Sequence, residues 1–165
     1  MKSVNQTIRK ITATDNAALA QMIRIVFEEH DAPQQGTVYS DPATDKLYEL
    51  FQTPGSILWV AEMHDTAVGC CGIYPTKGLP ENYAELVKFY LAKDARGYGI
   101  GKELLLKCIH SARELGYKQL YLESLPHFSK ALGMYEKQGF VRLEAPLGKS
   151  EHPGCTIWML KDLGY

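Results

Sequence analysis

The chain has 165 residues, 45% of them hydrophobic and 22% charged, which is the composition of a globular domain large enough to bury its own core. Its formal net charge of −1 gives no electrostatic case for a nucleic-acid or membrane partner. No apolar run approaches a membrane span and no signal peptide opens the chain, so we expect a single domain over residues 1–165, located in the cytoplasm.

The first third of the chain predicts a strand, a helix, a loop and a short second helix. Residues 4–12 alternate in part between apolar and polar side chains, which is typical of a strand. A helix cap at Thr14–Asp15 precedes a helical pattern of apolar residues that ends near His30. The next segment contains proline and glycine and is expected to be a loop. Asp41–Pro42 then opens a short second helix.

The middle of the chain predicts a hairpin followed by a strand-helix-strand unit. Residues 56–63 and 67–74 have strand patterns separated by three residues, which indicates an antiparallel hairpin. Residues 83–91 predict another strand, and a glycine-rich turn leads from it into a helix that ends at Gly116. Residues 118–124 predict the next strand. Because this strand follows the helix directly, it should pair in parallel with residues 83–91 through a right-handed crossover.

The glycine-rich turn from Arg96 to Gly101 carries the most chemical information. Gly97 and Gly99 adopt a positive φ at little cost, so N–H groups converge at the start of the following helix and favour an anion. Arg96 and Lys102 add positive charge beside them. The Gly-Lys-Ser/Thr of a nucleoside-triphosphate P-loop is absent, and a dinucleotide-binding fold would place such a turn early in the domain. The turn therefore predicts a different phosphate-bearing ligand.

The end of the chain predicts a short helix and two strands. The helix covers Ser129 to Gln138 and stops at Gly139. Strands are expected at 140–143 and 155–160, with a loop between them that contains glycine and proline. The chain has no internal repeat and no low-complexity segment.

The cysteines and histidines show no pattern of a disulfide or metal-binding protein. None of the four cysteines has Cys-x-x-Cys spacing, and the adjacent Cys70 and Cys71 should point to opposite faces of their strand. The five histidines are scattered without ligand spacing, so we predict no metal site.

Two motifs resemble those of a known family. Arg96, Gly99 and Gly101 match the Arg/Gln-x-x-Gly-x-Gly/Ala signature of the GCN5-related N-acetyltransferase (GNAT) superfamily, and they lie between a strand and a helix as they do there. Tyr135 to Phe140 resembles the superfamily's Tyr-x-x-x-Gly-Phe segment. The resemblance spans nearly the whole chain. It implies an α/β (α+β) fold with one mostly antiparallel mixed sheet of about seven strands, a splayed parallel pair and flanking helices.

The same resemblance implies an N-acetyltransferase that moves the acetyl group of acetyl-CoA to a primary amine. The compact chain favours a small-molecule acceptor over a protein tail. A non-catalytic acyl-CoA-binding sensor on this fold is the alternative. It is suggested by Phe128, which stands where the family often has an asparagine that bonds the cofactor arm. Homodimerisation through the last strands is common in the superfamily, and nothing in the sequence bears on it.

The resemblance also assigns candidate residues. Tyr135 matches the superfamily's general-acid tyrosine, which protonates the departing CoA thiolate. Glu85 sits where many members keep a glutamate that deprotonates the amine through water, and it could instead bind the acceptor's ammonium. The candidate acetyl-CoA contacts are Tyr90, Leu91, Arg96, Gly97, Tyr98, Gly99, Ile100, Gly101, Lys102 and Ser129. The candidate acceptor contacts are Glu28, Glu29, His30, Tyr39, Tyr83 and His127.

The sequence is compatible with two kinds of acceptor that differ in charge. Acidic residues in the first helix and near Tyr83 suit a cationic amine. Arg24 and Lys88 could instead hold an acceptor carboxylate. Loop residues such as Glu81 and His152 are also within reach of the expected cleft.

Overall fold

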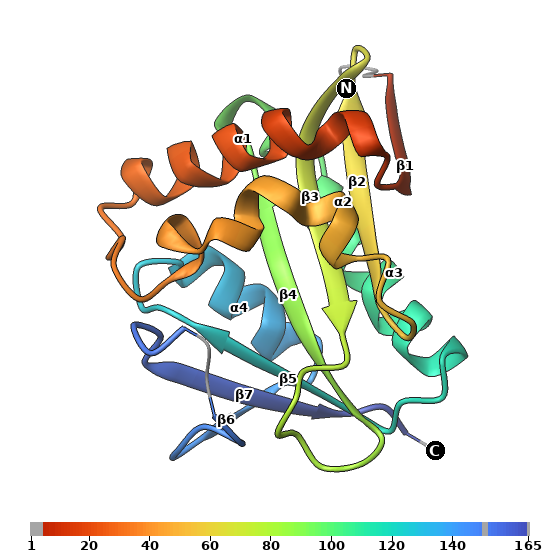
Figure 1. Ribbon diagram of the computed structural model, residues 1–165, viewed down its shortest axis with the longest axis vertical. Coiled ribbons are helices and arrows are strands. Elements are labelled where there is room, and N and C mark those ends of the chain that lie inside the picture. Colours follow the sequence, from red (N-terminus) through yellow and green to blue (C-terminus); the bar gives the residue numbers. More distant parts are fainter. Residues whose placement is uncertain (1–4, 150–151, 165) are drawn as a thin grey trace.

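One twisted mixed sheet with helices on both faces makes up the described part of the protein, as Figure 1 shows. The computed structural model describes residues 5–149 and 152–164. The strand order is β1-β2-β3-β4-β5-β7-β6, and the β4–β5 pair is parallel while the other neighbours are antiparallel. The predicted sheet is therefore confirmed. The strands are β1 (Gln6–Lys10), β2 (Ile57–Met63), β3 (Thr66–Tyr74), β4 (Tyr83–Leu91), β5 (Gln119–Ser124), β6 (Val141–Leu143) and β7 (Ile157–Asp162).

The helices follow the predicted order. Short 3₁₀ helices at Ala13–Asp15, Val38–Ser40, Pro42–Lys46 and Lys93–Ala95 supplement them. The α-helices are α1 (Asn16–Glu29), α2 (Leu47–Leu50), α3 (Ile100–Glu114) and α4 (Ser129–Lys137).

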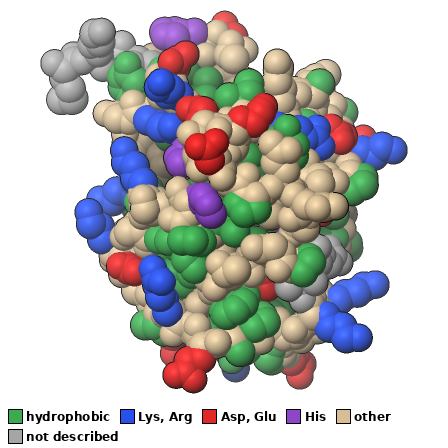
Figure 2. Space-filling model, turned by 90° about the vertical axis from the view of Figure 1, so that its left-hand side faces the viewer, with side chains coloured by type: hydrophobic (Ala, Val, Ile, Leu, Met, Phe, Trp, Pro, Cys, Tyr) green, Lys and Arg blue, Asp and Glu red, His purple; other side chains and the backbone are tan. Residues whose placement is uncertain are grey.

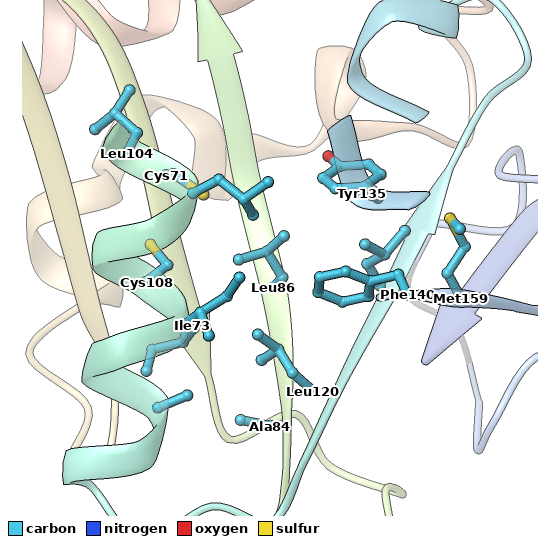
Figure 3. Close-up of a cluster of buried hydrophobic side chains, with 14 of the residues drawn as sticks. Cys71, Ile73, Ala84, Leu86, Leu104, Cys108, Leu120, Tyr135, Phe140 and Met159 are labelled. Atoms are coloured by element: carbon cyan, nitrogen blue, oxygen red, sulfur yellow. The ribbon is translucent and has the colours of Figure 1, made fainter. Parts of the chain in front are cut away.

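Buried side chains form two hydrophobic clusters. The first joins α1 and α2 to the sheet and contains Phe27 and Cys70. The second joins α3 and α4 to the sheet and contains Cys71 and Tyr135, and Figure 3 shows part of it. Cys70 and Cys71 are adjacent on β3 yet belong to different clusters, so the prediction that they point to opposite faces is confirmed.

The hairpin between β2 and β3 forms as predicted. His64 and Asp65 have φ values of 51° and 62°, which is the positive backbone conformation that a tight two-residue turn between twisted strands requires. The β2–β3 pairing runs antiparallel from Met63 opposite Thr66 to Ile57 opposite Ile73.

The starts of the first two helices differ in detail from the prediction. Asp15 precedes α1 without a side-chain capping bond, because its carboxylate accepts from the Thr12 N–H at 2.7 Å and pairs with the Arg9 guanidinium at 2.8 Å. The segment after Asp41 forms a 3₁₀ helix that continues into the single turn of α2. There the cap is as expected, since the Asp41 carboxylate accepts from the Ala43 N–H at 2.9 Å.

Candidate active site

Strands β4 and β5 pair briefly and then separate. Their parallel pairing covers three consecutive positions and ends at Glu85 opposite Tyr121. Beyond this point β4 follows β3 and β5 follows β7, which opens a wedge between them. The predicted splay of the parallel pair is therefore confirmed.

A β-bulge in β4 lies just inside this wedge. The register with β3 shifts between Val87 opposite Gly72 and Tyr90 opposite Cys70, and Lys88 has a φ of 57°. Strict alternation would place Lys88 on the same face as the core residue Leu86. The bulge interrupts this alternation, and Lys88 lines a pocket where its charge lowers the pKa of Asp41.

Two connected cavities follow the wedge. The inner pocket, with a volume of about 60 Å³, lies between β4 and β5 and reaches the loop before β7. The outer groove, with a volume of about 380 Å³, extends from the end of α1 to the glycine turn and α4. Four residues line both: Phe89, Tyr90, Phe128 and Ala131.

Charges of both signs surround this part of the surface. Figure 2 shows the side of the molecule that lies to the left in Figure 1, where α1 ends and the loop after it begins. Acidic and histidine side chains gather in the upper centre of this face, and Lys and Arg side chains lie along its left border. The surface therefore offers both anion-binding and cation-binding groups within a short span.

The glycine turn has the open geometry that the sequence predicts. Gly97 and Gly99 have φ values of 90° and 79°, and α3 begins directly after them at Ile100. Apart from the adjacent residues of the chain, no described heavy atom lies within 4 Å of the place where a Cβ would stand on Gly97 or Gly99. The backbone N–H groups at the start of α3 are thus reachable from the outer groove, and this concave backbone fits a phosphate group.

The neighbours of the turn have structural roles besides charge. Arg96 donates from Nε and Nη2 to the Leu91 carbonyl at 3.2 and 2.9 Å, and its Nη1 lies 3.5 Å from the Glu29 carboxylate. It therefore ties the turn to the end of β4 and to α1. At Gly101 a Cβ would stand 3.3 Å from the Met134 side chain, so this glycine allows α3 to pack closely against α4.

Tyr135 lies in the inner pocket, beside a residue that lines both cavities. It is 6% exposed, lines the inner pocket, and packs its ring against Phe89 and Phe140 at centroid distances of 5.8 and 5.7 Å. Figure 3 shows it in the wedge between β4 and β5. Burial raises the pKa of Tyr135 well above its usual value, so the phenol stays protonated at neutral pH and can act as a hydrogen-bond donor.

Two carboxylates from the separating strands line the inner pocket. Glu85 accepts a hydrogen bond from the Thr76 hydroxyl at 2.7 Å, and Glu123 accepts one from the Tyr121 hydroxyl at 2.7 Å. Burial and the hydrogen bond to Glu123 raise the pKa of Tyr121, so its hydroxyl remains a donor. The pair gives the pocket a negative wall that suits an ammonium group.

Two basic side chains line the same pocket. Lys88 is 7% exposed, and His152 reaches the pocket from the loop before β7. The His152 Nε2 atom lies 2.7 Å from the Asp41 carboxylate. Burial by itself raises the pKa of Asp41, but the hydrogen bond from His152 lowers it, and the resulting pKa lies below its usual value. This contact fastens the loop to the segment after α1.

The predicted acceptor contacts divide among several places. His30 lines the outer groove, where its ring packs against Phe128 at 5.4 Å. Tyr39 packs on Phe27 at 6.0 Å. The structure does not bring the remaining predicted acceptor residues together: Glu28 is exposed on α1, Glu29 pairs with Arg96, Tyr83 begins β4 at the paired end, and His127 is exposed before α4.

The predicted cofactor residues lie mostly together. Tyr90, Leu91, Arg96, Gly97, Gly99, Ile100, Gly101 and Lys102 all line the outer groove. Tyr98 is exposed on the turn between them. Ser129 is exposed at the first position of α4, beside the groove residue Lys130 and outside the groove lining.

The sequence prediction missed three polar residues of the pocket lining. Glu123 and Ser124 sit in an ordinary strand pattern, and Cys155 sits where a strand was expected to begin. Only the splay of β4 and β5 could have indicated them, because it turns the end of β5 toward the wedge. Burial and the charges of Glu123 and Glu85 raise the pKa of Cys155 to about 12, so its thiol is not a nucleophile at neutral pH.

The described residues show neither a metal-binding cluster nor a membrane-spanning helix. Among residues 5–149 and 152–164, no group of three or more His, Cys, Asp or Glu side chains is placed to hold a metal ion. In the same part of the chain, no helix combines the length and hydrophobicity needed to cross a membrane.

Comparison with known sequences points to one family. The model of the family described as Acetyltransferase (GNAT) family matches residues 21–140. An uncharacterized N-acetyltransferase, YjgM, of Escherichia coli (strain K12) is 36% identical over 157 residues, which cover 94% of each chain. The IAA acetyltransferase of Azospirillum brasilense is 32% identical over 93% of this chain and 98% of its own length.

Solved structures share the fold. An acetyltransferase of the GNAT family from Staphylococcus aureus Mu50 matches with a TM-score of 0.82 and 21% identity, covering 96% of this chain and 99% of that one. The protein yncA from Salmonella typhimurium, solved with its cofactor acetyl-CoA, matches with a TM-score of 0.76 and 18% identity, covering 96% and 94%.

Proposed function

The chain belongs to the GNAT family of acetyltransferases, and we propose that it transfers the acetyl group of acetyl-CoA to the primary amine of a small molecule. One observation carries the proposal: an open glycine turn and a pocket with a buried phenol and carboxylates are joined through a shared wall. A donor held in the outer groove would present its reactive end to the inner pocket.

The outer groove fits acetyl-CoA. The N–H groups of the turn from Gly97 to Gly101 suit the pyrophosphate, and the exposed Lys102 adds a positive charge. The backbone of Tyr90 and Leu91 lies along the path from the turn to the pocket and is proposed to bond the pantetheine arm. The Salmonella protein with this fold is solved with acetyl-CoA, which supports the assignment. When bound, the donor supplies an activated thioester carbonyl.

The proposed reaction balances in protons and electrons. The acceptor ammonium first loses one proton, and its lone pair then forms a C–N bond to the thioester carbonyl carbon. The C–S bond breaks and its electron pair leaves on the CoA sulfur. The nitrogen loses a second proton as the amide forms. One of the two protons ends on the sulfur and the other in solvent, which yields the acetamide and the CoA thiol.

We assign the first proton transfer to Glu85. Its carboxylate lines the inner pocket and is oriented by the Thr76 hydroxyl at 2.7 Å. An alkylammonium has a pKa of about 10, so only a small share of the amine is free at neutral pH and a base in the pocket speeds attack. Glu85 is proposed to act directly or through one water.

Tyr135 is the proposed donor to the leaving sulfur. Its pKa is raised by burial, so the phenol is neutral when the thiolate forms and can stabilise it with a hydrogen bond. Because an ordinary thiol has a pKa of about 8.5, the hydrogen bond matters more than complete proton transfer. Its ring is held by Phe89 and Phe140, which fixes the direction of the hydroxyl.

A CoA-release assay tests the proposal. The purified protein is mixed with acetyl-CoA and amino acids, polyamines, aminoglycosides or peptides, and free thiol and acetylated product are both measured. We expect release with at least one small amine and an equal amount of acetamide by mass spectrometry. Tight CoA binding in calorimetry without release across the panel would overturn the proposal and favour the non-catalytic sensor.

A further inference from the structure

We propose that the acceptor is a small amino acid, whose ammonium lies against Glu85 and Glu123 and whose carboxylate is bound by Lys88 with support from His152. The inference rests on the proposed function and names the acceptor class of the same site. It is drawn from the two signs of charge that line the inner pocket.

Lys88 is an unusual residue in two respects. Its backbone is left-handed, with φ at 57°, which is uncommon for a residue with a long side chain. It is also only 7% exposed, and lysine is among the side chains least often buried. Backbone outliers of this kind cluster at binding and catalytic sites. Here the bulge breaks the alternation of β4 at a residue that lines the pocket.

The charges are arranged at two ends of the pocket. Glu85 and Glu123 lie at the end where β4 and β5 still pair or have just separated. Lys88 lies three residues further along β4, on the side toward Asp41 and His152, and its charge lowers the pKa of Asp41. Cys155 lines the same pocket. A zwitterion matches this order of charges.

Other acceptor classes fit less well. Polyamines and aminoglycosides bring several cations, and Lys88 in the pocket lining would repel a second one. A lysine side chain of a peptide carries no carboxylate near its amine. The two carboxylates and the buried lysine of the lining together favour a molecule with one amine and one carboxylate.

The sequence offered Arg24 as the other candidate for binding an acceptor carboxylate. Arg24 donates from Nη1 and Nη2 to the two oxygens of Asp45 at 2.6 and 3.0 Å, and from Nε to the Tyr39 carbonyl at 3.0 Å. It does not line either cavity of the wedge. Of the two basic residues that the sequence suggested for this role, Lys88 is therefore the one placed to perform it.

The test compares L-amino acids with the matching amino-acid amides. The amine of an amide is the less basic of the two, so basicity alone favours the amide. We expect kcat/KM to be about 10- to 100-fold higher for the free acid, the effect of one hydrogen bond between charged groups. Lys88→Gln should remove this preference, Lys88→Arg should keep part of it, and the exposed-site control Lys46→Gln should keep all of it.

Calorimetry separates this inference from the proposed function. Titration of the same L-amino acids into the complex with CoA needs no turnover, and binding should be lost in Lys88→Gln while CoA affinity stays unchanged. Turnover of amines without a preference for the free acid would overturn the inference and leave the acetyltransferase proposal standing. A preference that survives in Lys88→Gln would also overturn it. Amino acids that bind the CoA complex without any turnover would overturn the proposed function instead.

Discussion

The outer groove and the inner pocket differ in the chemical groups that they offer to a ligand. The groove presents backbone N–H groups of a glycine turn, with two positive φ angles and open space where side chains would stand. The pocket presents side chains, namely carboxylates, a lysine and a phenol carried by two separating strands and α4. We therefore expect the groove to bind the same donor in every protein with this turn. The pocket should instead determine which acceptor is used.

This difference has a physical basis. Backbone groups cannot change their charge, so a site made from them recognises a phosphate in the same way in every protein with this turn. Side chains can be exchanged without altering the sheet, so a pocket made from them can differ between proteins of one fold. Variants in the groove should change donor affinity, and variants in the pocket should change turnover or acceptor affinity.

The largest effect is expected in the pocket, at Tyr135. Tyr135→Phe keeps the ring contacts with Phe89 and Phe140 and removes the hydroxyl. We expect kcat to fall about 10²- to 10⁴-fold because the leaving thiolate loses its donor. CoA affinity, measured by calorimetry, should change less than about twofold. An unchanged kcat would remove Tyr135 from the mechanism.

The two carboxylates of the pocket should differ in importance. Glu85→Gln is expected to lower kcat about 10- to 100-fold and to flatten the acid limb of the pH–rate profile, because the proposed base is gone. Glu123→Gln keeps the pocket shape and should mainly raise the acceptor KM. Steady-state kinetics from acid to alkaline pH decide which of the two carboxylates is the base. A larger loss of kcat in Glu123→Gln would assign this role to Glu123 on β5.

A matched pair of glycine variants tests the groove. Gly99→Ala adds a methyl group to the proposed phosphate cradle, whereas Gly116→Ala adds one at the far end of α3. Both residues have a positive φ and, apart from the adjacent residues of the chain, no described atom within 4 Å of the new Cβ, so both variants should lose about 1 kcal/mol of stability. Only Gly99→Ala should weaken CoA binding, by about tenfold. Equal CoA affinities would contradict the placement of the pyrophosphate.

The smallest effect is expected where His152 holds the pocket loop to Asp41. Asp41→Asn should cost about 0.5–1 kcal/mol at neutral pH and raise the acceptor KM while leaving CoA affinity intact. The pKa of Asp41 is lower in the folded protein than in the unfolded chain. Its contribution is therefore present above about pH 4 and is lost as the pH falls through the folded pKa. Urea unfolding at several pH values should show the two proteins converging in acid. A difference that grows in acid would contradict this.

The part of the groove that is proposed to hold the phosphates could be predicted from the sequence because its residues are contiguous. The turn, the strand before it and the helix after it lie within one short segment, and glycine spacing directly reports positive φ angles. The position of Tyr135 followed from a second local motif. The two roles that local spacing could not show were those of Arg96, which bonds the Leu91 carbonyl, and Gly101, which makes room for Met134.

The pocket could not be predicted in the same way. Its walls come from α1, β4, β5, α4 and the loop before β7, and no local pattern brings these segments together. Glu123 belongs to a plain strand pattern. Lys88 reads as one more residue of a strand, because a bulge formed by a lysine leaves no glycine as a signal. His152 reaches the pocket only through a loop whose course depends on its contact with Asp41.

The most direct test of the account is a crystal structure of the protein with CoA. We predict that the pyrophosphate lies on the N–H groups from Gly97 to Gly101 and that the thiol ends within hydrogen-bonding distance of the Tyr135 hydroxyl, at the junction of groove and pocket. A thiol that ends away from Tyr135, or a pyrophosphate bound elsewhere than on the glycine turn, would contradict the division of the site into a donor groove and an acceptor pocket.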